Sequence, residues 1–160
     1  MMGQLMSIRF RIALAAAALV GFVHPAFSEE QPFGRAGDPK KVSRTIDLDM
    51  SDAMRFAPAE LVVKQGETVR FRLKNSGKVM HEMVLGAMQD LNAHAETMRK
   101  DSGMHHHGAA NMVHVAPGKT AALVWQFTQS GEFHYGCLVP GHFEAGMVGR
   151  VRVLASSDKM

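Results

Sequence analysis

The sequence predicts an all-β fold, a Greek-key β-sandwich with a short helix and loop insertion. Two observations carry this prediction. Short segments in which apolar and polar residues alternate recur along residues 44–156, and Gly, Pro and Asn turn signals separate them. The chain has 160 residues, of which 46% are hydrophobic and 21% charged, a balance typical of one folded domain.

Seven or eight segments are expected to form strands. In the clearest of them Val69, Phe71 and Leu73 alternate with basic residues, as in a strand with one buried face. Gly, Pro and Asn turns at this spacing favour a sandwich over a helical domain. The other expected strands are residues 45–50, 61–63, 79–85, 121–128, 132–137 and 148–154.

One segment has the helical period instead. Within residues 89–100, Leu91, Ala95 and Met98 stand four and three residues apart, and Ala, Glu and Arg favour a helix. The stretch 101–110 is polar and contains glycine, so it is expected to be a loop.

The N-terminus predicts a secretory signal peptide over residues 1–28. Arg9 and Arg11 precede an apolar run over residues 12–23, and small residues lead up to a cleavage point after Ser28. The run is shorter than the roughly 20 residues that cross a membrane. We therefore expect export to the periplasm and no membrane span in the mature form.

The mature chain is expected to begin with a flexible arm over residues 29–43, which carry Pro, Gly and charge without periodicity. Loss of Arg9 and Arg11 lowers the net charge from +3 to about +1, and no run of five basic residues exists, so nucleic acid is not an expected partner. A single cysteine excludes an internal disulfide and zinc sites that need two or more cysteines. We expect a monomer.

The strongest chemical signal is the C-terminal run Cys137-x₄-His142-x₄-Met147. The expected strand ends at Cys137, and the turn Pro140-Gly141 directs His142 back towards it. A second short loop brings Met147 to the same place. Thiolate, imidazole and thioether on one loop are three of the four ligands of a blue-copper site, in which two His and one Cys bind with a weak axial Met.

The fourth ligand must come from elsewhere, and His81 is the best candidate. It follows the turn at residues 75–77 and lies in an expected strand that can meet the loop at one end of the sandwich. Taken singly, each residue has an ordinary structural interpretation, because a lone Cys or Met usually fills a core. Their combination, in this order, favours a metal site.

The order of one upstream His followed by Cys, His and Met resembles the cupredoxin family, over most of residues 44–154. The ligand-loop spacing resembles auracyanin and rusticyanin more than plastocyanin. The resemblance implies a cupredoxin-like sandwich with one type 1 copper, cycling between Cu(I) and Cu(II). In this chain the implied ligands are His81, Cys137, His142 and Met147.

Two neighbouring residues bear on this site. Many blue-copper proteins have Asn or Ser after the upstream His, where it braces the cysteine loop, but this chain has Glu82. Contacts around the sulfur tune colour and potential, so the site is open to being blue or green. His134 lies three residues before Cys137, and strand periodicity places it on the opposite face, exposed and not a ligand.

A second group of Met and His residues lies between the strands. From Met80 to His114 the chain holds six of its 13 Met and six of its 9 His, many of them in an insertion at about residues 87–114. With the sequence His-Glu-Met-Val-Leu-Gly, this enrichment resembles the periplasmic copper-tolerance cupredoxins of the CopI-like group. A possible accessory site for a second, weaker copper is formed by Met104, His105, His106 and His107.

The alternative for this segment is a solvated polar loop with ordinary core methionines. Two functions remain for the whole protein: periplasmic copper tolerance or copper handling, and mobile single-electron transfer between periplasmic redox partners. A redox or copper-trafficking partner is expected to dock near His142, on the apolar residues Leu138, Val139, Pro140 and Phe143. An enzyme is not expected, because copper oxidases and nitrite reductases need further paired histidines and more than one domain.

Overall fold

The computed structural model describes residues 31–100 and 109–157. The signal peptide predicted over residues 1–28 lies outside this part of the chain, as do the accessory candidates Met104, His105, His106 and His107.

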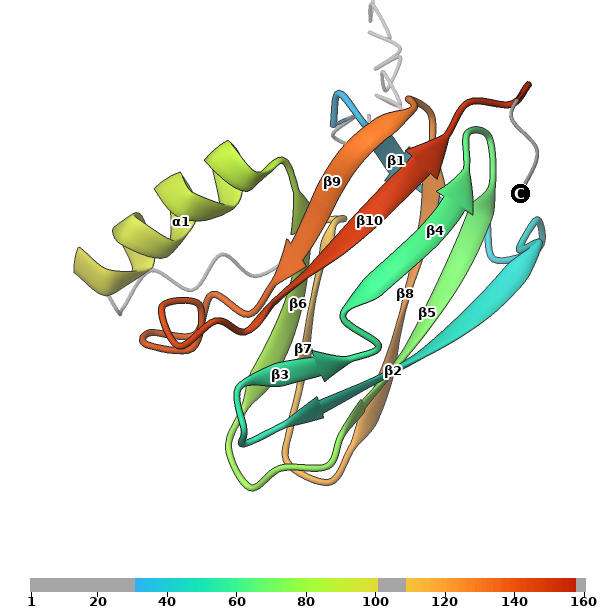
Figure 1. The fold of residues 1–160 in the computed structure, drawn as a ribbon. Helices are drawn as coiled ribbons and strands as arrows, with labels where there is room; N and C mark the ends of the chain where they lie inside the picture. Colours follow the sequence, from blue (N-terminus) through green and yellow to red (C-terminus); the bar gives the residue numbers. More distant parts are fainter. Residues whose placement is uncertain (1–30, 101–108, 158–160) are drawn as a thin grey trace, which may run out of the picture.

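The strands of the described residues form two five-stranded sheets (Figure 1). The first sheet has the order β1 (Gly34–Ala36), β8 (Thr120–Phe127), β5 (Thr68–Asn75), β2 (Arg44–Ser51) and β3 (Arg55–Ala57). The second has the order β4 (Glu60–Lys64), β10 (Val148–Leu154), β9 (Gly131–Gly136), β6 (His81–Gly86) and β7 (Met112–Val115). Two strand pairs are parallel, β2 with β5 and β4 with β10, and the other pairs are antiparallel. The predicted all-β Greek-key sandwich is confirmed.

The core lies between the two sheets and follows the alternation seen in the sequence. Val69, Phe71 and Leu73 of β5 are fully buried, while the basic residues between them lie on the outer face. Trp125 and Phe127 of β8 face the same core. Residues of the second sheet and of the connection between β9 and β10 complete the core. They are Val63, Met83, Leu85, Tyr135, Cys137, Met147, Val151 and Val153.

The expected helix forms α1 (Met88–Lys100), which lies beside the sandwich against β6 and β9 (Figure 1). Its buried residues are Leu91, Ala95 and Met98, the three that the sequence period selects. They form a small second apolar cluster with Val84 and Leu138, on the outer side of the second sheet. No helix in the described ranges is long and apolar enough to cross a membrane.

The prediction of a flexible arm over residues 29–43 is wrong for residues 34–36. Residues 34–36 form β1, which pairs antiparallel with β8, and Phe33 is only 2% exposed. Phe33 packs against the ring of Trp125 with centroids 5.4 Å apart. A three-residue strand is too short to show alternation, so the pairing could not be recognised from the local sequence.

Two further short strands, β3 and β7, were also not predicted. β7 occupies the end of the expected insertion at 87–114, and pairs antiparallel with β6 from Met112 onwards. Conversely, β6 begins at His81 rather than at Val79, because residues 76–80 form a loop held by side-chain hydrogen bonds.

Candidate metal centre

Three of the four predicted ligands lie on the connection between β9 and β10, which main-chain hydrogen bonds close into a tight loop. Cys137 N–H donates to the carbonyl of Met147 over 3.0 Å, and Met147 N–H donates to the carbonyl of His142 over 3.0 Å. Cys137 and Met147 are fully buried, and His142 is half-buried. The loop therefore fixes the three residues relative to one another.

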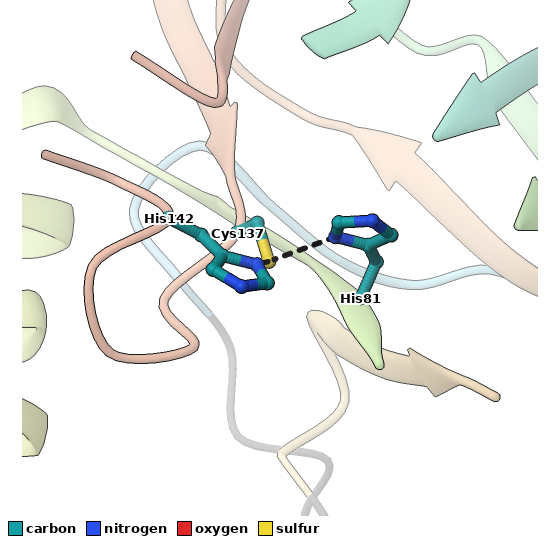
Figure 2. A group of neighbouring side chains, drawn as sticks. All are labelled: His81, Cys137 and His142. Atoms are coloured by element: carbon teal, nitrogen blue, oxygen red, sulfur yellow. Dashed lines mark hydrogen bonds between the residues drawn. The ribbon is translucent and has the colours of Figure 1, made fainter. Parts of the chain in front are cut away.

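His81 meets this loop from the first residue of β6. Its Nδ1 lies 3.9 Å from the Cys137 sulfur, and Nδ1 of His142 lies 3.3 Å from the same sulfur. Figure 2 shows the imidazole rings of His81 and His142 beside the Cys137 side chain. The candidate ligand atoms of the three residues all lie within 4.8 Å of one another, close enough to share one metal ion.

A buried asparagine shapes the loop that leads to His81. Asn75 donates from its side-chain amide to the carbonyls of Val79 and Val115, both over 2.8 Å, and accepts from Gly77 N–H. Because Asn75 is 0% exposed, these bonds are shielded from water. They fix the point at which β6 begins, and hence the position of His81.

Glu82 braces the cysteine from the other side. Its main-chain N–H donates to the Cys137 sulfur over 3.4 Å, and its Oε1 accepts from Leu138 N–H over 2.9 Å. Its Oε2 lies 2.7 Å from Nε2 of His114 on β7. Glu82 is 3% exposed, so a buried carboxylate occupies the bracing position that the sequence comparison with blue-copper proteins singled out.

Burial shifts the pKa of two candidate ligands, Cys137 and His142. It raises the pKa of the Cys137 thiol to about 12, so a metal ion must displace a proton to bind the sulfur. Burial also lowers the pKa of His142 below its ordinary value, and repulsion from His81 acts in the same direction. A neutral imidazole is the form that binds metals.

The β2–β3 hairpin adds two contacts that the sequence did not predict, one from Asp52 in its turn and one from Arg55 in β3. Asp52 Oδ1 lies 3.3 Å from Nε2 of His81, on the side of the ring away from the cysteine. A hydrogen bond from the Lys78 N–H holds the pKa of Asp52 below its ordinary value, and one from the Val79 N–H acts in the same direction. Arg55 donates to the carbonyl of Ala145 over 2.8 Å, within the loop that carries Met147.

Two details of the sequence prediction need correction. His134 lies on the opposite face of the chain from Cys137, as expected, but its side chain is only 16% exposed because it lies in a hollow with Ala59, Met88 and Val148. Leu138, expected in an exposed docking patch, is 1% exposed because it packs in the cluster beneath α1. Pro140 is exposed, whereas Val139 and Phe143 are half-buried.

Asp52, Asn75 and His114 were missed as residues around the site. Asp52 and His114 reach it from strand pairs distant in the sequence, so no local motif marks them, whereas Asn75 was recognised only as part of the turn at residues 75–77. Glu82 was found, because it directly follows a candidate ligand.

The donor set fits copper. One thiol and two imidazole nitrogens converge at a buried point, and a thioether lies in the same loop, which is the His₂Cys–Met combination typical of type 1 copper. Glu82 donates a hydrogen bond to the Cys137 sulfur, and Asp52 contacts Nε2 of His81, the nitrogen that faces away from the sulfur. Such contacts around the ligands are general in protein metal sites.

The chain is similar to known copper proteins over most of its length. A family model described as copper binding proteins, plastocyanin/azurin family, matches residues 42–154. The copper-resistant cuproprotein CopI of Rubrivivax gelatinosus is 50% identical over 128 residues, which cover 80% of this chain and 77% of the relative. CopI of Pseudomonas aeruginosa is 34% identical over 179 residues, covering 89% of this chain and 97% of the relative.

Solved structures agree on the fold. Auracyanin B superimposes with a TM-score of 0.62 at 20% identity, over 78% of this chain and 96% of that one. Auracyanin A of Chloroflexus aurantiacus superimposes with a TM-score of 0.58 at 24% identity, over 69% of this chain and 98% of that one. Since the family match runs from just before β2 to the last residue of β10, the chain belongs to the plastocyanin/azurin family of copper-binding proteins, the cupredoxins.

Proposed function

We propose that this protein is an exported cupredoxin of periplasmic copper tolerance, with one redox-active type 1 copper held by His81, Cys137, His142 and Met147. The convergence of two imidazoles and one thiol within 4.8 Å carries the proposal. The similarity to CopI proteins, which are named as copper-resistant, supports the tolerance role. When bound, copper supplies a one-electron couple between Cu(I) and Cu(II).

The residues around the site act by holding the donors in place. Main-chain bonds fix Cys137, His142 and Met147 on one loop, and Asn75 fixes the start of the strand that carries His81. A preorganised donor set needs little rearrangement when the charge of the metal changes. The same rigidity retains copper tightly, which suits a protein that removes free copper ions. We propose that the protein binds copper and exchanges electrons without turning over a substrate.

The alternative function is a mobile single-electron carrier. Val79 and Met80, directly before His81, are 41% and 43% exposed, and Pro140 is exposed near His142. Such apolar residues beside a half-buried ligand suit transient docking of a redox or copper-trafficking partner. This observation favours a carrier, whereas the Met and His enrichment favours copper handling.

The primary test is copper stoichiometry with the visible spectrum of the mature protein. One copper per chain and strong thiolate-to-Cu(II) absorption are expected, and Cys137→Ala is expected to abolish the absorption. Met83→Leu, which changes another fully buried sulfur residue of the same core, is the matched control and keeps the colour. Persistence of the absorption in Cys137→Ala would refute the site.

A second test separates the two functions. In a strain lacking the gene, the wild-type protein is expected to restore growth at high copper, and Cys137→Ala is not. Equal copper tolerance with and without the protein, together with rapid electron exchange with a periplasmic redox protein, would favour the carrier. Fractionation of the cells checks the expected periplasmic location.

A further inference from the structure

The imidazole of His81 is held at both of its nitrogens. Nδ1 faces the Cys137 sulfur at 3.9 Å, while Nε2 faces the Asp52 carboxylate at 3.3 Å. The ring is completely buried, whereas the Asp52 side chain is 38% exposed. Asp52 therefore lies between the buried candidate ligand and solvent.

We propose that Asp52 is a positioning residue for the metal site, which fixes the tautomer and orientation of His81 and favours the oxidised, Cu(II) state. This inference rests on the proposed role of His81 as a copper ligand. A carboxylate only accepts hydrogen bonds, so its contact places the imidazole proton on Nε2 and leaves the Nδ1 lone pair directed at the site. A carboxylate on the far nitrogen also makes a ligating histidine more basic.

The fold holds Asp52 in this position through the loop before His81. Its Oδ2 accepts from Lys78 N–H over 2.7 Å, and its Oδ1 accepts from Val79 N–H over 3.4 Å. The hairpin turn thus binds the loop and the imidazole with one side chain. Asn75 holds the same loop from the core side.

Gly77 makes room for this carboxylate. A Cβ atom at Gly77 would lie 2.0 Å from Asp52 Oδ1, closer than a van der Waals contact allows. Any side chain at residue 77 therefore fits only if the Asp52 carboxylate moves. A side chain at residue 77 would displace the Asp52 carboxylate without changing any charged group. Gly77→Ala therefore tests the position of Asp52 independently of substitutions at Asp52 itself.

The electrostatic consequence concerns the reduction potential. A negative charge hydrogen-bonded to a ligand stabilises the more highly charged Cu(II) ion more than Cu(I). Asp52→Asn keeps an acceptor oxygen for His81 but removes the charge. Asp52→Ala removes both, and Gly77→Ala moves the carboxylate away.

The experiment measures the tautomer of His81 in the copper-free protein and the reduction potential of the copper-loaded protein. Nitrogen-15 NMR is expected to show the Nε2–H tautomer in the wild type and in Asp52→Asn, and a mixture in Asp52→Ala and Gly77→Ala. Asp52→Asn is expected to weaken Cu(II) binding relative to Cu(I) about tenfold, which raises the potential by about 59 mV.

Asp49→Asn is the matched control. Asp49 lies on the adjacent strand β2 and accepts from Ser76, so the variant removes one charge near the same loop without a contact to His81. In Asp49→Asn the ratio of Cu(II) affinity to Cu(I) affinity is expected to change less than twofold, so the potential stays close to that of the wild type. An unchanged tautomer in Asp52→Ala, or equal potentials in Asp52→Asn and Asp49→Asn, would overturn the proposal.

Different results would refute the copper site and the role of Asp52. If the wild-type protein bound no copper through Cys137, the proposed function would be refuted, and the tautomer in the copper-free protein would still report on Asp52. If the wild type had a normal type 1 spectrum and Asp52 had no effect on tautomer or potential, only this inference would fail.

Discussion

Glu82 donates its main-chain N–H to the sulfur of Cys137 over 3.4 Å, across 55 residues of sequence. The same residue accepts with its side chain from Leu138, directly after the cysteine. One residue of β6 therefore holds both the sulfur and the start of the ligand loop.

Replacement of the Glu82 carboxylate is expected to change both stability and potential. Glu82→Ala leaves the buried Leu138 N–H without its acceptor, which costs about 1–3 kcal/mol of unfolding free energy. Glu82→Gln retains an acceptor oxygen but removes a buried negative charge, so the reduction potential is expected to rise. Urea unfolding and voltammetry measure the two effects.

Glu60→Gln is the control for Glu82→Gln. Glu60 forms an exposed ion pair with Arg150 on the outer side of the second sheet. Its loss is expected to change stability by less than about 1 kcal/mol and to leave the potential unchanged. Equal potentials in the two Gln variants would contradict the role assigned to Glu82.

Met147→Gln is expected to retain copper and to lower the potential. An amide oxygen is a harder ligand than a thioether and favours Cu(II) over Cu(I). A tenfold change in the ratio of the two affinities corresponds to about 59 mV. Voltammetry and copper analysis test this, with Met83→Leu as a buried control that leaves the potential in place.

The accessory copper site is tested by replacing Met104, His105, His106 and His107 together with Ser. The wild type is expected to bind a second, weaker copper equivalent, since a site assembled from a loop loses conformational entropy on binding. The variant is expected to lose that equivalent, keep the visible spectrum and make its strain more sensitive to copper. A single equivalent in both proteins, with equal tolerance, would leave a plain electron-transfer cupredoxin.

Helix α1 is expected to stabilise the domain through its buried face. Leu91 is 2% exposed and packs in the cluster that contains Leu138. Leu91→Ala is expected to lower the unfolding free energy by about 2–4 kcal/mol, because it leaves a cavity. Asn92→Ala, on the exposed side of the same helix, is expected to change it by about 0.5 kcal/mol or less. Similar urea midpoints for both variants would contradict this packing.

His134 is expected to make the protein less stable in acid. Burial lowers the pKa of His134 below its ordinary value of 6.5, and Arg150 adds to this while Glu132 opposes it. Well above pH 6.5 the residue is neutral in both states. As the pH falls below 6.5, the unfolded chain binds a proton that the folded chain binds less readily, so stability is lost.

His134→Gln removes this titration. Between pH 7 and pH 5 the wild type is expected to lose more unfolding free energy than the variant, and urea titrations of both proteins at each pH measure the difference. If the unfolding free energies of the two proteins fell in parallel with pH, the pKa of His134 would be the same in the folded and unfolded states.

The fold class and three of the four candidate ligands have local signals in the sequence. The alternation around Phe71 reports one buried face of a strand, and the spacing of Leu91, Ala95 and Met98 reports one face of a helix. Cys137, His142 and Met147 lie within one short loop, so chain geometry alone keeps them close. The choice of His81 depended on its place after the turn at residues 75–77, in an expected strand that can meet this loop at one end of the sandwich.

The surroundings of the site depend on tertiary structure. β1 and β3 are too short for a periodic signal and exist because longer strands pair with them. Asp52 reaches His81 across 29 residues, and Glu82 reaches the ligand loop across more than 50. Sequence determines which donors are available through residue type and local period, whereas the pairing of distant strands decides which charges and hydrogen bonds face those donors.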